Sequence, residues 1–160
     1  MLAIIGILVA VVLTILNPAL RLQQSRDAVR QNDVQAILQA IRLHEIDNNG
    51  NLLEDIDNLQ DYDVYMAVFG SGMGDGCDDN NTYCSSNVST DTYCVDISDL
   101  IQEGFLAEMP ISPKGQITWD DGTASGENGS GYTISKTPLD VLTVRACENE
   151  ATSVEIEVSG

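Results

Sequence analysis

The spacing of apolar residues changes once along the N-terminal part of the chain. Residues 1–16 are almost entirely apolar and carry no charge. After them, apolar residues recur with the three-to-four-residue spacing of an amphipathic helix. Four of these lie on one helix face: Val34, Ile37, Leu38 and Ile41. The pattern predicts one helix that runs from the apolar block to about Ile46, where the Asp-Asn-Asn-Gly cluster at 47–50 favours a turn.

The apolar block at 1–16 has the composition of a membrane anchor or of a protein core. At about 1.5 Å per residue it reaches roughly 24 Å, slightly less than the roughly 30 Å hydrocarbon core of a bilayer. A secretory signal peptide fits less well, because the block lacks a basic flank and a small-x-small cleavage motif. An ordinary single-pass anchor is the other alternative. Since a proline inside a helix removes a hydrogen bond and clashes with the preceding turn, we expect a kink or a locally opened segment near Pro18.

The rest of the chain consists of short apolar runs separated by polar loops. One run predicts a strand at 64–69, and residues 70–92, rich in Gly, Asp, Asn and Ser, predict a long surface loop. Residues 96–104 predict a short capped helix that ends at Gly104. Further strands are predicted at 116–119, 132–136, 141–147 and 153–158.

These elements predict an α+β fold in which the long N-terminal helix packs on a small antiparallel sheet of three to four strands. We divide the chain into a helical rod, residues 1–46, and a head, residues 47–160. The head contains a disulfide-bearing loop at 70–95 and a C-terminal sheet at 115–158. Because the apolar face of that sheet needs cover, we expect the second half of the rod to pack on it.

The net charge of −18 is distributed unevenly along the chain. Residues 1–44 carry four arginines and two aspartates, a net charge of +2. Residues 45–160 carry three basic and 23 acidic side chains, a net charge of −20. Phosphate binding depends on lysine and arginine, so this acidic head argues against a nucleic-acid partner.

The head also contains the four cysteines of the chain: Cys77, Cys84, Cys94 and Cys147. They form no Cys-x-x-Cys motif, which argues against a zinc site. An even number of cysteines in a small, loop-rich head predicts two disulfides, for which three connectivities are possible. We favour Cys77–Cys84 together with Cys94–Cys147, because the second bond closes a long loop.

Residues that carry catalytic chemistry are few. The single histidine, His44, lies in the rod. We expect it to be a partly exposed helix residue rather than part of a hydrolytic triad, and we predict no enzymatic activity. Calcium is the one cofactor with candidate ligands, since carboxylates cluster in the acidic loops. The candidates are Asp75, Asp78 and Asp79, or alternatively Asp55, Asp57, Asp61 and Asp63. A solvated acidic loop without metal is the simpler alternative.

Three segments together resemble those of a known family. Residues 3–10, AIIGILVA, look like the second half of the N-terminal signature of type IV pilins and pseudopilins. Residues 25–34, followed by the turn at 47–50, are similar to the helix-to-loop junction of many bacterial pilins. Residues 100–113, with a glycine-aromatic-leucine run and two prolines, resemble the family's segment before its sheet. The N-terminal segment is the specific part of the resemblance.

The resemblance implies a structural protein that polymerises into an extracellular type IV pilus. Before assembly the apolar block lies in the inner membrane, and afterwards many copies bury it in a filament core. The copies meet through a heterologous, non-closing contact, which produces a helical filament. The implied partners are further copies of the chain, the pilus assembly machinery and prepilin peptidase. The residues expected in the assembly core are Ile4, Ile5, Gly6, Ile7, Leu8, Val11, Val12, Leu16 and Pro18.

The family's cleavage glycine, methylated terminal residue and glutamate do not occur in this sequence, which enters the signature partway. Either they precede Met1 or the chain is not processed as the family is, and we favour the first. The resemblance to secretion pseudopilins adds Asp120, Asp121 and Glu127 as calcium candidates. Arg21, Arg26 and Arg30 either meet anionic lipid and neighbouring acidic heads, or form a solvated helix face that pairs Asp27 with Arg30.

Two other functions remain open from the sequence. A type II secretion or competence pseudopilin would form a short pseudopilus instead of a long filament. A membrane-anchored module that binds a ligand through its acidic, disulfide-bonded loop belongs to a different functional class.

Overall fold

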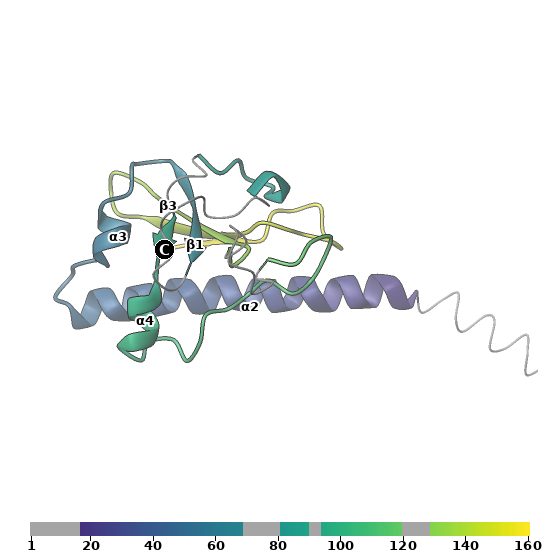
Figure 1. Ribbon diagram of the computed structural model, residues 1–160, viewed down its shortest axis with the longest axis horizontal. Helices are drawn as coiled ribbons and strands as arrows, with labels where there is room; N and C mark the ends of the chain where they lie inside the picture. Colours follow the sequence, from purple (N-terminus) through teal and green to yellow (C-terminus); the bar gives the residue numbers. More distant parts are fainter. Residues whose placement is uncertain (1–16, 69–80, 90–93, 120–128) are drawn as a thin grey trace, which may run out of the picture.

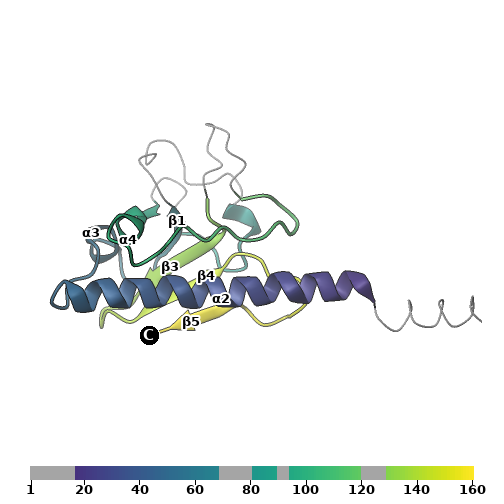
Figure 2. The ribbon, with the colours of Figure 1, turned by 90° about the horizontal axis from the view of Figure 1, so that it is seen from below.

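A long helix lies along one face of a five-stranded sheet in the computed structural model, which describes residues 17–68, 81–89, 94–119 and 129–160 (Figures 1 and 2). The helices are α2 (Pro18–Asp47), α3 (Glu54–Asp57), α4 (Ser98–Gln102) and the 3₁₀ turn η1 (Asn81–Tyr83). The strands are β1 (Val64–Val68), β2 (Val95–Asp96), β3 (Tyr132–Lys136), β4 (Leu142–Ala146) and β5 (Glu157–Ser159). This arrangement confirms the predicted α+β class.

Helix α2 begins at a proline instead of containing it. Asn17 has a positive φ of 33°, and its side chain accepts a hydrogen bond from the backbone N–H of Leu20 at 3.5 Å. Pro18 is therefore the first helical residue, where its missing N–H leaves no hydrogen bond unmade. The expectation that Pro18 lies inside one continuous helix is wrong, because Asn17 caps α2 directly before it in a left-handed conformation. Residues 1–16 lie outside the described part of the chain.

The C-terminal end of α2 agrees with the predicted turn. The helix ends at Asp47, one residue after the predicted position, and the Asn48 N–H donates to the carbonyl of His44 at 2.9 Å. Gly50 then adopts a φ of +89°, a left-handed conformation that glycine tolerates without strain.

The sheet has the order β2-β1-β3-β4-β5 and is mixed, because β1 and β2 are parallel while the other pairs are antiparallel. The predicted antiparallel sheet of three to four strands is therefore too small. Strands β1, β3 and β4 were expected within one or two residues of their observed limits. The parallel pairing of β2 was not expected, since a two-residue strand has too few positions to show an alternating pattern.

Two other strand predictions need correction. Residues 116–119 are irregular, because the Gln116 N–H donates to Glu148 Oε1 at 2.9 Å instead of to a neighbouring strand. The last strand is shorter and later than the predicted 153–158. Val154 is 71% exposed and lies before the residues around Val158 that pair with β4. The alternation of apolar and polar residues is the same in both places, so it did not show where the strand begins.

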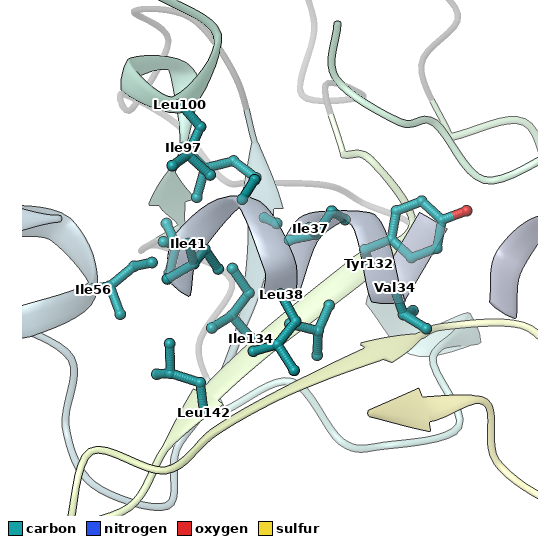
Figure 3. Packing of buried hydrophobic residues seen from close by; sticks show 14 of the residues in the cluster. Val34, Ile37, Leu38, Ile41, Ile56, Ile97, Leu100, Tyr132, Ile134 and Leu142 are labelled. Atoms are coloured by element: carbon teal, nitrogen blue, oxygen red, sulfur yellow. The ribbon is translucent and has the colours of Figure 1, made fainter. Parts of the chain in front are cut away.

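Alternating strand residues form the core between the sheet and α2 (Figure 3). From α2 come Val34, Ile37, Leu38 and Ile41, and from the strands come Tyr65, Ala67, Tyr132, Ile134, Leu142 and Val144. All four helix residues are buried, which confirms that the second half of the predicted rod covers the sheet. The residues that alternate with Tyr65 and Ala67 on β1 point to the opposite face of the sheet. There Met66 and Val68 pack with Trp119 and Cys147.

Candidate functional site: the junction between helix and head

Arg30 of α2 is a fully buried cation at the junction between the helix and the head. Its guanidinium pairs with Asp27 Oδ1 at 2.8 Å and Glu150 Oε1 at 2.8 Å, and with Glu148 Oε2 at 3.3 Å. It also donates to Ser112 Oγ and to the carbonyl of Pro113, both at 3.0 Å. These partners use the fork of donors that distinguishes arginine from lysine.

Asp27 connects the same helix to the segment that follows β4. Its carboxylate accepts backbone N–H groups from three successive residues, Glu150, Ala151 and Thr152, at distances from 2.7 to 3.3 Å. Successive N–H groups that converge on one carboxylate form a concave anion-binding turn. Asp27 therefore fixes this segment on α2 while it also neutralises Arg30.

Arg26 completes the group, which we call the junction cluster: Arg26, Asp27, Arg30, Glu148 and Glu150. The Arg26 guanidinium donates two hydrogen bonds to the carboxylate of Glu150, one of them at 2.8 Å. The hydrogen bond from Arg26 lowers the pKa of Glu150 below its ordinary value, burial opposes this effect, and Arg30 adds to it. The same contact raises the pKa of Arg26.

The junction cluster revises the expected role of the arginines. Asp27 and Arg30 do pair three residues apart, but in a buried site and not on a solvated face. The other acidic partners of Arg26 and Arg30 are Glu148 and Glu150 of the chain's own head. Arg21 is exposed and contacts Gln24 at 3.3 Å. Chemically, the cluster holds the helix against the head through interactions among its own side chains.

Asp33 forms a second polar contact between α2 and the sheet. It accepts a hydrogen bond of 2.5 Å from the hydroxyl of Tyr132, which is fully buried. Burial raises the pKa of Asp33, and the hydrogen bond from Tyr132 acts in the opposite direction. Burial also raises the pKa of the Tyr132 hydroxyl, and the Asp33 carboxylate raises it further.

The disulfide between Cys84 and Cys147 corrects the favoured pairing. It joins the segment after η1 to the residue after β4, so neither Cys77–Cys84 nor Cys94–Cys147 forms. Cys94 is also disulfide-bonded, while Cys77 lies outside the described residues. The favoured pairing was wrong because Cys84, Cys94 and Cys147 all pack in the cluster around Trp119, and the fold places Cys84 next to Cys147.

His44 is buried, in contrast to the expected partly exposed position. Its Nε2 lies 3.3 Å from Glu103 Oε2, and its ring packs edge-on against Phe105 with 5.7 Å between ring centroids. Both partners follow α4, so His44 helps attach that segment to α2.

The acidic calcium candidates of the described part do not converge on one point. Asp55 accepts the backbone N–H of Asp96 at 3.2 Å, and burial raises its pKa. Asp57 instead lies 3.9 Å from the ammonium group of Lys136. Within the described ranges, no group of three or more His, Cys, Asp or Glu side chains has the arrangement of a metal site. The candidates Asp75, Asp78, Asp79, Asp120, Asp121 and Glu127 lie outside these ranges.

Acidic residues also line a cleft of about 310 Å³ between α3 and α4. Its walls carry Glu54, Asp55, Asp96 and Asp99, together with Leu53 and Ser98. Such a cleft favours cationic groups, and the sequence did not predict it because α3 and α4 are separated by 40 residues or more of chain.

Of the residues expected in the assembly core, the structure describes Pro18, which is exposed. The others, Ile4, Ile5, Gly6, Ile7, Leu8, Val11, Val12 and Leu16, lie outside the described residues. Among the helices of the described part, none is long and apolar enough to cross a membrane.

Sequence reasoning identified the three arginines but not their partners Glu148, Glu150 and Ser112. The available signal was weak: two glutamates within three residues after a cysteine, in a chain with an excess of acids. No protein-family model, curated protein or solved structure matches this chain.

Proposed function

We propose that this protein is the repeating structural subunit of a type IV pilus, with the fold of the type IV pilins. The observation that carries the proposal is the continuation of an apolar block into a helix that serves two purposes. Residues 1–16 are apolar in sequence, and α2 starts directly after Asn17. The helix buries one of its faces on the head between Asp27 and His44, whereas residues 17–22 are exposed and extend beyond the sheet (Figure 1).

The junction cluster supports this function mechanically. A subunit pulled through its head transmits force to α2, so the two parts need contacts that resist separation. Arg30, with its carboxylate partners and its bonds to Ser112 and Pro113, supplies such contacts near the start of the buried part of α2. The Cys84–Cys147 bond adds a covalent link next to Glu148.

Filaments sheared from the surface of cells that express the chain test this proposal. We expect electron microscopy to show long filaments, and mass spectrometry to find this chain as their main component. The mature N-terminus from the same filaments would reveal whether prepilin peptidase and a methyltransferase process the chain. Short structures that appear only when secretion genes are overexpressed would instead indicate a pseudopilin.

A membrane-anchored ligand-binding module is the second candidate, and the acidic cleft between α3 and α4 favours it. In that case the chain stays in the membrane, no surface filament contains it, and the detergent-extracted protein is monomeric. The replacement Asp96→Asn would then weaken the binding of a cationic ligand, whereas a pilus subunit with the same replacement assembles normally.

A further inference from the structure

Three asparagines and a glycine, residues 48–51, connect α2 to the segment that leads into α3 (Figure 1). The side-chain amides of Asn48 and Asn51 donate hydrogen bonds within this turn, to the carbonyl of His44 at 3.1 Å and to the carbonyl of Asn48 at 2.8 Å. Asn49 is exposed, and its side chain makes no hydrogen bond in the part of the chain that the structure describes. The Asn49 amide is therefore accessible to chemical modification.

Gly50 directly follows this amide in the sequence. The backbone nitrogen of a residue can attack the side-chain carbonyl carbon of a preceding asparagine and close a five-membered ring. Glycine favours this reaction, because it has no Cβ to obstruct the approach and its backbone adopts conformations that other residues avoid. The Asn-Gly pair also occurs at 128–129, where the asparagine lies outside the described residues. The sequence therefore gives Asn49 the neighbour that best supports ring closure.

The native turn opposes this reaction. The Gly50 N–H donates to the carbonyl of Glu45 at 2.7 Å, so the proton that the nitrogen must lose is held in a hydrogen bond. Asn49 and Gly50 have φ angles of +58° and +89°, two successive left-handed residues that follow the end of α2. Ring closure therefore requires this turn to open. Helix ends open more easily than the rest of a fold, because few buried contacts hold them.

We propose that Asn49 is a site of spontaneous deamidation that becomes reactive when the C-terminal turn of α2 opens. The Gly50 nitrogen then loses its proton and bonds to Asn49 Cγ, and the Cγ–Nδ2 bond breaks to release ammonia. Water hydrolyses the resulting cyclic imide. Hydrolysis at Cγ gives aspartate, whereas hydrolysis at the backbone carbonyl gives isoaspartate, in which the main chain runs through Cγ. Water is the only co-reactant, and no atom changes its oxidation state.

Either product weakens the connection between α2 and the head. The new carboxylate lies two residues after Asp47, at the negative end of the helix dipole, where a further negative charge is unfavourable. Isoaspartate also adds a carbon atom to the main chain, which displaces the Gly50 N–H from the carbonyl of Glu45. Leu53, which follows the turn, is buried in the core. Deamidation therefore loosens the head at the opposite end of the buried part of α2 from the junction cluster.

Peptide mapping by mass spectrometry tests the proposal on the full-length chain, incubated in mild detergent at neutral to mildly alkaline pH. The control within the same molecule is Asn58, which is exposed and makes no side-chain hydrogen bond among the described residues. The next residue, Leu59, also has its N–H hydrogen-bonded, to the carbonyl of Ile56 at 3.2 Å. In the folded chain, we expect Asn49 to deamidate about tenfold faster than Asn58, because glycine replaces leucine as the attacking residue. Denaturant should raise the rate at Asn49 about tenfold, because it releases the Gly50 N–H.

Two variants separate the opening of the turn from the sequence motif. Asn51→Ala removes the side-chain hydrogen bond to Asn48 and should raise the rate at Asn49 in the folded chain about threefold. Asn58→Ala, at an exposed position outside the turn, should leave that rate unchanged. Mapping of the Cys84–Cys147 bond confirms that both variants are folded.

Two results overturn the inference: equal rates at Asn49 and Asn58 in the folded chain, or equal rates at Asn49 in the folded and the unfolded chain. The inference goes beyond the proposed function and is independent of it, because none of these measurements requires a filament.

Discussion

At Arg30, one guanidinium contacts three carboxylates, a hydroxyl and a carbonyl oxygen. Burial of a charge is costly unless it is paired and hydrogen-bonded, and Arg30 meets both conditions. Its local partner Asp27 follows from a spacing of three residues on a helix. Its distant partners Glu148 and Glu150 lie 118 and 120 residues further along the chain, beyond the reach of any periodic pattern.

Removal of this cation should strongly destabilise the fold. Arg30→Met leaves three carboxylates without their common partner, and we expect a loss of about 3–5 kcal/mol in the free energy of unfolding. Arg30→Lys retains the charge but not the fork, so we expect a smaller loss. Urea unfolding of both variants measures these losses in the free energy of unfolding. The control is Arg21→Met at an exposed position, which should stay within about 0.5 kcal/mol of the wild type. A near-neutral Arg30→Met variant would contradict the role assigned to the cluster.

Gly131 is a second position where one residue controls the packing. It has a φ of +77°, and a Cβ added there would lie 2.6 Å from Ser112 Cβ and 2.7 Å from Trp119 Cδ1. We expect Gly131→Ala to cost about 3 kcal/mol, because backbone strain and a clash with the fully buried Trp119 add together. Gly104→Ala is the matched control.

Gly104 has a φ of +83° but nothing within 4 Å of the added Cβ. Gly104→Ala should therefore lower the free energy of unfolding only by the backbone strain, about 1–2 kcal/mol. Thermal unfolding of the two variants separates strain from packing. Similar losses in both would show that Trp119 moves aside without cost.

The elements of the fold differ in how far the sequence predicts them. Strand β3 and the end of α2 agree with their predictions because each has a strong local signal, a short β-rich run or a turn ending in glycine. The order of the sheet does not follow from such signals, since β1 and β2 pair in parallel and β1 lies beside β3. The segment 116–119 resembles a strand by composition, yet its hydrogen bond to Glu148 holds it outside the sheet.

The Cys84–Cys147 bond shows the same limit at the level of elements, because the sequence does not show which cysteine the fold places next to Cys147. It joins residues 63 positions apart and should stabilise the head by about 2–4 kcal/mol. We expect the double variant Cys84→Ser/Cys147→Ser to lose this amount in urea unfolding. Mass mapping of the non-reduced wild type should recover a peptide pair containing Cys84 and Cys147. A Cys94–Cys147 pair would contradict the structure.

At the scale of the whole molecule, acid has opposing effects on stability. Protonation of the many carboxylates relieves repulsion within the head. The lowered pKa of Glu150, caused mainly by Arg26, means that this residue stabilises the fold above its unfolded pKa, and that this contribution is lost as the pH falls through its folded pKa. The raised pKa of Asp33, caused by burial, has the opposite sign, so its contribution is present below its unfolded pKa and is lost as the pH rises through its folded pKa.

Variants of these two residues separate their contributions from the general effect of charge. Glu150→Gln removes the titration at the junction cluster, so we expect the wild type to exceed it in stability most at about pH 7 and progressively less toward about pH 3. Asp33→Asn retains an acceptor for the Tyr132 hydroxyl but not the buried charge, so the wild type should gain relative to it as the pH falls over the same range. Urea unfolding at a series of pH values measures both differences. If the gap between the wild type and Glu150→Gln stays constant with pH, the ion pair with Arg26 does not hold the head on the helix; if it closes in acid, the junction cluster is an acid-sensitive link between the two parts of the molecule.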